Sequence, residues 1–381
     1  MASLACTVNG LKLPNPFVIG SGPPGTNANV IGKAFDEGWG AVIAKTVSLD
    51  ASKVINVAPR YARMRVGPKA TETIVGWQNI ELISDRPFET WEEEFRQVKQ
   101  KYPGRVLIAS IMEEYSKDRW VECVQRCEAA GVDAFELNFS CPHGLPERKM
   151  GAAMGQDPEI LEEVCGWVSG AARVPVWAKM TPNITHIEEP ARAALRAGCD
   201  GIAAINTILC VMGVDLKTLR PEPTVEGYTT PGGYSCKAVR PIALRMVMEC
   251  ARMMQPEFPD RTISGIGGVE TGDDAAQFIL LGAHTVQVCT GVMIHGYKLI
   301  HELNRGLLAF MDQHKFSTID EFRGHSLRYF TTHADLVQRQ AAAKEAEKAA
   351  VASKRSGMVT KDTQWTGDKF VEQSEKLVAN G

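Results

Sequence analysis

Residues 134–141 read AFELNFSC, a short apolar run that ends in polar side chains. The run is too short for a helix and is apolar on both faces, which is typical of a parallel strand covered by helices. Asn138, Ser140 and Cys141 lie together where the strand stops. The fold therefore depends on how often this pattern recurs along the chain.

The pattern occurs eight times, with longer amphipathic stretches between the runs. The runs are PFVIGS (16–21), AVIAKTV (41–47), VLIASIM (106–112), AFELNFS (134–140), VPVWAKMT (174–181), GIAAINTI (201–208), TISGIGGV (262–269) and TVQVCTGV (285–292). Helices are expected over 28–39, 90–102, 118–131, 157–172, 187–198, 239–254 and 272–282. This alternation over about 275 residues predicts an α/β fold, a closed (β/α)8 TIM barrel, whose usual size is about 250 residues. A doubly wound open sheet is the alternative.

Two long insertions, 48–105 and 209–238, interrupt the regular spacing. Loops of this length are usually functional or fold over a site. After a further helix over 297–314, we expect the barrel domain to end, so that the domains are 1–315 and a C-terminal helical extension, 316–381. Residues 338–355 are rich in Ala, Lys and Glu and lack an apolar stripe, which predicts a solvated helix or a frayed tail.

Composition and charge exclude several classes of protein. A net charge of −3 gives no basic footprint for nucleic acid. No apolar run reaches the roughly 18 residues that would span a membrane. The N-terminus lacks the features of a signal or transit peptide. Ten scattered cysteines without a C-x2-C pair indicate free thiols, and neither an iron–sulfur cluster nor a metal site is expected.

Polar residues at the carboxyl ends of barrel strands point into the active site. Two of these positions are lysines, Lys45 and Lys179. A buried ammonium group needs a partner, and no acidic residue immediately follows either lysine. A bound anionic cofactor would supply one; the alternative is that each lysine extends to solvent at the rim. Asn79, Asn138 and Asn206 accompany the two lysines, and this combination favours a binding site.

Small residues follow the seventh and eighth runs, at Gly267-Gly268 and at Cys289-Thr290-Gly291. Barrels of this kind commonly bind phosphate there through backbone N–H groups. A tight turn alone would also explain the two glycines. Because small residues follow both the seventh and the eighth run, a phosphate site is favoured. Neither a P-loop motif nor a complete G-x-G-x-x-G motif is present, so no separate dinucleotide domain is recognisable.

Cys141 lies in a polar loop at a strand end. A thiol with a pKa near 8.5 is mostly protonated at neutral pH and can donate a proton in a transition state. The alternative, a small buried hydrophobe, is accepted for most of the other cysteines.

The motifs NFSCPHG, AKMTPN, AAINTI, TPGGYS and SGIGGVETG together resemble the dihydropyrimidine dehydrogenase family. More broadly, they resemble the FMN barrel of the dihydroorotate dehydrogenase superfamily. The likeness is greatest to the short plant-type form, which consists of the FMN barrel and a C-terminal tail. It covers nearly the whole chain, and its motifs are several, long and in order.

The resemblance implies a flavin-dependent oxidoreductase that reduces the C5=C6 bond of uracil and thymine, the first step of pyrimidine catabolism. Hydride would pass from FMN N5 to C6, and Cys141 would protonate C5. The implied cofactor-binding residues are Ser21, Lys45, Thr46, Lys179, Cys236, Gly267, Gly268, Val269, Cys289 and Thr290. The implied substrate-binding residues are Asn79, Asn138, Ser140, Asn206 and Thr207. Asparagine suits this role because its amide both donates and accepts, as the edges of uracil do.

The iron–sulfur and NADPH/FAD portions of the long animal-type form are not recognisable here. Electrons would then come from NADPH directly or from a donor protein. By resemblance we expect a plastid location, and otherwise a cytoplasmic one; the tail makes a homodimer plausible. Two other functions stay open: oxidation of dihydroorotate, and a non-catalytic subunit that binds nucleobases.

Overall fold

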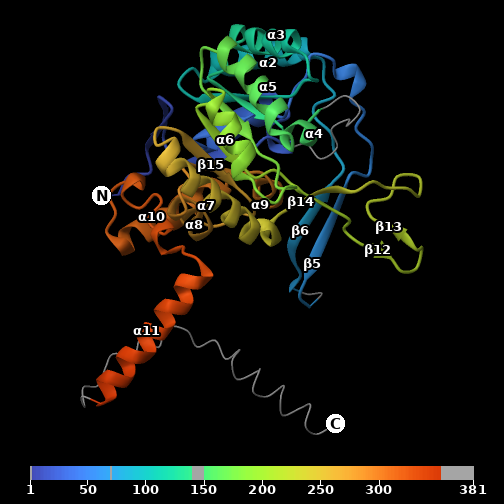
Figure 1. Ribbon diagram of the computed structural model, residues 1–381. Helices are drawn as coiled ribbons and strands as arrows, with labels where there is room; N and C mark the ends of the chain where they lie inside the picture. The colour runs from blue at the N-terminus through green and yellow to red at the C-terminus, as the bar shows by residue number, and fades with distance from the viewer. Residues whose placement is uncertain (1, 69–70, 140–149, 353–381) are drawn as a thin grey trace. The chain divides into compact units, whose positions relative to one another are not determined.

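The computed structural model describes residues 2–68, 71–139 and 150–352, and its largest sheet is a closed parallel barrel (Figure 1). The barrel strands, in hydrogen-bonded order, are β3 (Phe17–Ile19), β4 (Ala41–Ile43), β7 (Val106–Ile111), β8 (Ala134–Asn138), β9 (Val176–Lys179), β10 (Gly201–Ala204), β15 (Thr262–Ile266) and β16 (Thr285–Val288). β16 pairs with β3, which closes the barrel. Each predicted run contains one of these strands, so the (β/α)8 barrel is confirmed and the open sheet is wrong.

Helices surround the barrel where amphipathic stretches predict them. They are α1 (Ala28–Glu37), α2 (Phe88–Lys101), α3 (Lys117–Ala129), α5 (Pro158–Ala171), α6 (Glu188–Arg196), α7 (Arg240–Glu257), α8 (Gly272–Leu280) and α10 (Leu299–His314), with the short helices α4 (Ala152–Gly155) and α9 (Thr290–His295). Local chemistry sets their ends. Thr271 and Asp274 form a reciprocal capping box at the start of α8, and Gly38 ends α1 in a left-handed conformation with φ 102°.

A short hairpin, β1 (Cys6–Val8) and β2 (Leu11–Leu13), covers the amino end of the barrel. Val8 and Leu13 of the hairpin pack with Val18, Ile43 and Ile108 of the barrel interior. Apolar side chains therefore fill that end of the barrel.

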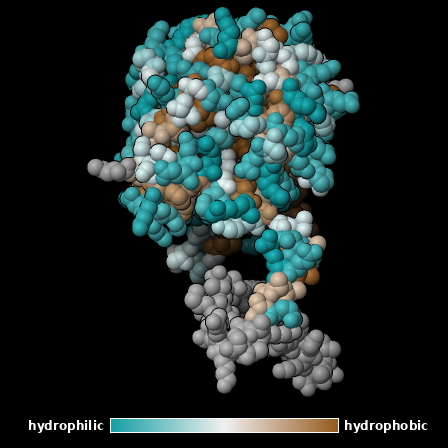
Figure 2. All heavy atoms as spheres, turned by 60° about the vertical axis from the view of Figure 1, so that its left-hand side comes forward, coloured by the Kyte–Doolittle hydropathy of each residue, from teal (hydrophilic) through white to brown (hydrophobic). Residues whose placement is uncertain are grey.

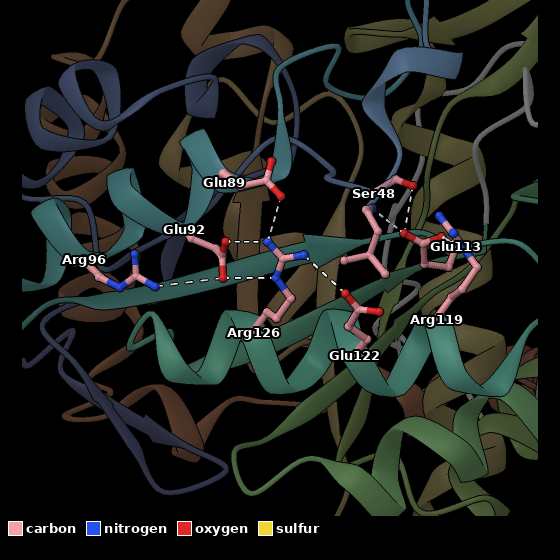
Figure 3. Close-up of polar contacts among 9 residues, drawn as sticks. Ser48, Glu89, Glu92, Arg96, Glu113, Arg119, Glu122 and Arg126 are labelled. Atoms are coloured by element: carbon pink, nitrogen blue, oxygen red, sulfur yellow. Dashed lines mark hydrogen bonds and ion pairs between the residues drawn. The ribbon is translucent and has the colours of Figure 1, made fainter.

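Ion pairs link the outer helices and the loops at the carboxyl ends of the strands (Figure 3). Glu113, just after β7, is 1% exposed and accepts hydrogen bonds from Ser48 Oγ at 2.8 Å and from the Leu49 N–H at 2.5 Å. Arg119 of α3 pairs with Glu113 at 2.9 Å. At the other end of α3, Arg126 pairs with Glu92 of α2 at 2.6 Å. The Glu113 contacts therefore hold the segment that follows Lys45 and Thr46, whereas the Arg126 pair joins α3 to α2.

The two insertions form a second, antiparallel sheet. Its order is β11 (Ile208–Cys210), β14 (Gly232–Ser235), β6 (Thr73–Asn79) and β5 (Tyr61–Val66), and a small hairpin, β12 (Val214–Asp215) and β13 (Arg220–Pro221), adjoins it in sequence. These strands were not predicted. Most are two to four residues long and are not strongly apolar, so no periodicity identifies them.

The first compact unit runs from Met1 to Leu327, not to the predicted boundary at 315. Ile319, Phe322 and Leu327 are buried in the barrel's core cluster, which ties 316–327 to the barrel. The second unit, Arg328–Gly381, contains helix α11 (His333–Ala352). The side chains of residues 336–346 are exposed, in agreement with the predicted solvated helix.

Hydrophilic residues predominate on the face shown in Figure 2, with hydrophobic residues scattered among them. The most exposed large hydrophobic side chains lie instead in the insertions, at Ile55, Leu216, Leu219 and Tyr228. Within the described residues, no helix is both long and apolar enough to cross a membrane. The nine cysteines that the structure describes are all free.

Candidate active site

One cavity at the carboxyl end of the barrel collects every predicted site residue that the structure describes. These are Ser21, Lys45, Thr46, Asn79, Asn138, Lys179, Asn206, Thr207, Cys236, Gly267, Gly268, Val269, Cys289 and Thr290. The cavity has a volume of about 1200 Å³, including its open mouth. Ser140 and Cys141 lie outside the described residues.

Both lysines are buried in this cavity and each has a carboxylate partner. Lys45 Nζ lies 3.0 Å from Glu81 Oε1, and Lys179 Nζ lies 3.0 Å from Glu136 Oε1. The exposed fractions are 7% for Lys45 and 4% for Lys179, so neither side chain extends to solvent. The sequence predicts a bound anionic cofactor as the partner and does not identify these two carboxylates, which come from residues distant in the sequence.

Sequence reasoning missed Glu81, Glu136 and Gln287, which also line the cavity. Gln287 Oε1 accepts a hydrogen bond from Lys179 Nζ at 3.0 Å. Glu136 and Gln287 each lie inside an otherwise apolar strand, and that pattern could have identified them. Glu81 lies in an insertion, where no pattern distinguishes it from a surface acid.

Hydroxyl groups orient Asn138 at the end of β8. Its Nδ2 donates to Thr46 Oγ1 at 3.0 Å. Thr46 Oγ1 also lies 3.2 Å from Ser21 Oγ and 2.8 Å from Ser110 Oγ, and Ser21 Oγ donates to the Ala44 carbonyl. Because Thr46 accepts from the amide nitrogen, the direction of the Asn138 amide is fixed.

The other two asparagines reach the cavity from different elements. Asn79 ends β6 of the second sheet, and its Nδ2 donates to the Gly233 carbonyl at 3.5 Å. Asn206 follows β10, and its Oδ1 accepts from the Thr207 N–H at 2.8 Å. The expectation that the long insertions fold over a site is therefore confirmed for Asn79 and its neighbours Tyr61 and Trp77.

The wall beyond β15 and β16 requires small residues. Gly268 has φ 71°, and a Cβ there would lie 2.6 Å from the Cys236 carbonyl oxygen. Cys236 Sγ lies 3.7 Å from the Ile74 carbonyl oxygen and from Glu270 Oε1. Ser235 directly precedes Cys236, and its Oγ lies 2.8 Å from Thr290 Oγ1. The wall thus offers hydroxyl groups and closely packed backbone, which suits a phosphate group.

Comparison with known proteins identifies the family of the chain. Residues 3–311 match the model of the family described as dihydroorotate dehydrogenase. The chain belongs to the dihydroorotate dehydrogenase family. The motif resemblance is thereby confirmed, and with it the expectation of an oxidoreductase.

Three similar proteins show the range of the likeness. The chain is 67% identical over 380 residues to the chloroplastic dihydropyrimidine dehydrogenase (NADP(+)) of Arabidopsis thaliana, covering 99% of this chain and 88% of that protein. It is 41% identical over 321 residues to the NAD-dependent dihydropyrimidine dehydrogenase subunit PreA of Escherichia coli, covering 84% and 76%. It is 34% identical over 321 residues to the catalytic subunit of dihydroorotate dehydrogenase B (NAD(+)) of Methanothermobacter thermautotrophicus, covering 84% and 97%.

Two of the described cysteines, Cys236 and Cys289, line the cavity. Burial raises the pKa of each to about 11, and for Cys289 the nearby Lys179 and Lys45 ammonium groups oppose the rise. Both thiols are therefore protonated at neutral pH and are poor nucleophiles. Their position beside the small-residue wall agrees with a role in lining the site.

Proposed function

We propose that this chain is a flavin-dependent dihydropyrimidine dehydrogenase that reduces the C5=C6 bond of uracil and thymine. The observation that carries the proposal is the convergence of Asn79, Asn138 and Asn206 on one cavity with two buried lysines. Uracil is a neutral ring that alternates N–H donors with C=O acceptors. Amide side chains match both kinds of group without adding charge.

FMN fits the residues of the cavity. Lys45, Lys179, Ser21 and Thr46 would contact its ring system, and the wall at Gly267, Gly268, Val269, Cys236, Cys289 and Thr290 would hold its phosphate. The close packing of Gly268 against Cys236 supports this assignment, because a side chain at residue 268 would displace that wall. When bound, FMN supplies the hydride chemistry, which no protein side chain provides.

Cys141 is the proposed proton donor to C5. Asn138, at the end of β8, lines the cavity, and Cys141 follows it by three residues. Ser140 and Thr207 complete the proposed substrate-binding set with the three asparagines. A donor of this kind must reach to within hydrogen-bonding distance of the atom that it protonates.

Replacing the proton donor is the sharpest test of this mechanism. We expect Cys141→Ala to lower turnover of uracil by about 10²–10⁴, the usual contribution of a general acid. Binding of uracil, measured as a perturbation of flavin absorbance, should be retained. The matched control is Cys210→Ala, because Cys210 is half-buried in β11 and lies outside the cavity lining. Unchanged turnover in Cys141→Ala would remove this residue from the mechanism.

NADPH is the proposed electron donor, since the Arabidopsis relative is named for NADP(+). The E. coli relative is named as a subunit, so a donor protein is the alternative. Anaerobic mixing of the flavin-loaded chain with NADPH, NADH and reduced ferredoxin, each followed by flavin bleaching, distinguishes the donors. The chloroplastic name of the Arabidopsis relative supports a plastid location. The homodimer and the lack of an iron–sulfur cluster stay predictions.

Substrate class is tested by assaying uracil and dihydroorotate side by side. Orotate carries a carboxylate, which needs a further cation in its pocket. Lys45 and Lys179 are each paired with a carboxylate already, which favours a neutral base. Turnover of dihydroorotate alone would overturn the proposal, and purified chain that cannot be loaded with FMN would do so too.

A further inference from the structure

Three polar side chains form a closed set at the floor of the cavity: Glu136 of β8, Lys179 of β9 and Gln287 of β16. Each is at most 4% exposed, and all three line the cavity. Lys179 Nζ lies 3.0 Å from Glu136 Oε1 and 3.0 Å from Gln287 Oε1. Gln287 Nε2 donates to Glu136 Oε2 at 2.7 Å. Every member of the set therefore contacts the other two.

The orientation of the Gln287 amide is locked by a second partner. Its Nε2 also donates to Ser264 Oγ at 3.0 Å, and Ser264 Oγ accepts from Thr285 Oγ1 at 2.7 Å. Both hydrogens of the Gln287 amide nitrogen are thus engaged. The amide oxygen can only face Lys179, because a rotated amide would lose two donors and turn its NH₂ group toward an ammonium group.

Stability alone does not explain this set. Burying an ammonium group and a carboxylate together removes both from water, and apolar residues of similar volume are often at least as stable. The geometry does have a consequence for the cavity, because two acceptors hold the end of a flexible four-carbon side chain in one place. It also gives the set a net charge of zero rather than the +1 of an isolated lysine.

We propose that Glu136 and Gln287 are positioning residues that hold the Lys179 ammonium against the bound flavin, and that the charge of Glu136 limits the electron affinity of that flavin. This inference rests on the proposed function, because the responding group is FMN. Reduction adds negative charge to the flavin ring; the ammonium group favours that charge and the carboxylate opposes it. Removing the carboxylate charge while keeping the side chain's shape therefore makes reduction more favourable.

The test is the midpoint potential of the flavin in the full-length chain. We expect Glu136→Gln to favour the reduced flavin by about tenfold or more, and a tenfold change is about 30 mV for a two-electron couple. The matched control is the exchange Glu136→Gln with Gln287→Glu, which moves the carboxylate across the set and preserves charge and volume. Its potential should return to near the wild-type value, a rescue that a merely structural defect would not give. An unchanged potential in flavin-loaded Glu136→Gln overturns the charge effect.

A second measurement tests the positioning without cofactor. The chain is stripped of flavin, and Lys179→Met is made in the wild-type background and in the Glu136→Gln background. We expect it to shift the unfolding equilibrium at least about tenfold more in the wild-type background. Only there does it leave a buried carboxylate, Glu136, without its ammonium partner. Equal shifts overturn the proposed contact. A wild-type chain that binds no FMN would defeat the proposed function together with the charge effect, whereas a loaded variant with unchanged potential defeats the inference alone.

Discussion

At the scale of single residues, His284 links the acid stability of the barrel to one imidazole. His284 precedes β16, and its Nδ1 accepts a hydrogen bond from the Ile263 N–H at 3.1 Å. Burial, followed by the nearby Arg323, lowers the pKa of His284 from 6.5 to about 3, while Asp320 acts in the opposite direction. The ring is therefore neutral in the folded chain at pH values where the unfolded chain is protonated.

The sign of the resulting pH dependence follows from linkage. Between pH 6.5 and 3 the unfolded chain binds the extra proton, so the free energy of unfolding falls as pH falls, by up to about 1.4 kcal/mol per pH unit. We expect His284→Asn, whose side-chain oxygen can accept from Ile263, to flatten the decline between pH 6.5 and 5 by roughly this slope. Urea unfolding followed by circular dichroism at several pH values measures it. Parallel profiles for variant and wild type would show that His284 is not the responsible group.

The strand-end pattern identified two lysines that line one cavity, but it did not identify their ion-pair partners. Lys45 and Lys179 were identified because charge at the end of an apolar strand needs compensation. Glu81 and Glu136 could not be assigned to them from sequence, because the pairing depends on an insertion that folds back and on which strands become neighbours. The role proposed for Cys141 stays a prediction.

At the scale of elements, α8 and α10 approach so closely that backbone meets backbone. A Cβ at Gly272, the first residue of α8, would lie 2.2 Å from Leu307 N and 2.4 Å from Gly306 C in α10. A Cβ at Gly306 would lie 3.0 Å from Gly272 Cα. The crossing is thus far less tolerant of a side chain on α8 than on α10.

Three glycine-to-alanine variants measure this contact. Gly272→Ala should lower the free energy of unfolding by about 1–3 kcal/mol or more, because neither backbone can move aside easily. In Gly306→Ala, the tight contact is offset by the gain in helix propensity of about 1 kcal/mol, so the net change should be small. Gly166 of α5, with no atom within 4 Å of its added Cβ, is the control and should stabilise by about 0.5–1 kcal/mol. Denaturant unfolding measures the free energy of unfolding of all three variants. Equal changes for Gly272→Ala and Gly166→Ala would contradict the close packing of α8 against α10.

Element types were predictable where length and periodicity were strong. The barrel strands and main helices stand out as repeated apolar and amphipathic runs. The strand Gly232–Ser235 has the sequence GGYS, which has no strand pattern, and it pairs with β6 and β11 only because the chain brings them together. Tertiary contact creates that sheet, and the sequence between residues 209 and 238 carries no local signal for it.

At the scale of the whole molecule, the segment 316–327 completes the barrel's core after the last barrel helix. Phe322 is fully buried, and its ring centroid lies 5.3 Å from that of Phe310 and 5.2 Å from that of Phe316. Backbone hydrogen bonds also tie the segment down: the Gly324 N–H donates to the Ile279 carbonyl at 2.9 Å. The boundary at 315 was expected because the predicted helix ends there, and short 3-10 turns such as Ile319–Glu321 have no periodic pattern.

Two truncated chains distinguish the predicted domain boundary at 315 from the observed one at 327. A chain ending at Leu327 should keep its melting temperature within a few degrees and still bind FMN, because it retains Ile319, Phe322 and Leu327 of the core cluster. A chain ending at Lys315 loses Ile319, Phe322 and Leu327, and deletion of each large buried side chain costs about 2–5 kcal/mol. Their sum rivals the 5–15 kcal/mol that typically holds a protein folded, so this chain should be largely unfolded at 25 °C. Thermal melts by circular dichroism, with flavin content as a second readout, compare them. If both truncated chains melt like the full-length chain, then 316–327 is dispensable and the barrel ends where the last helix does.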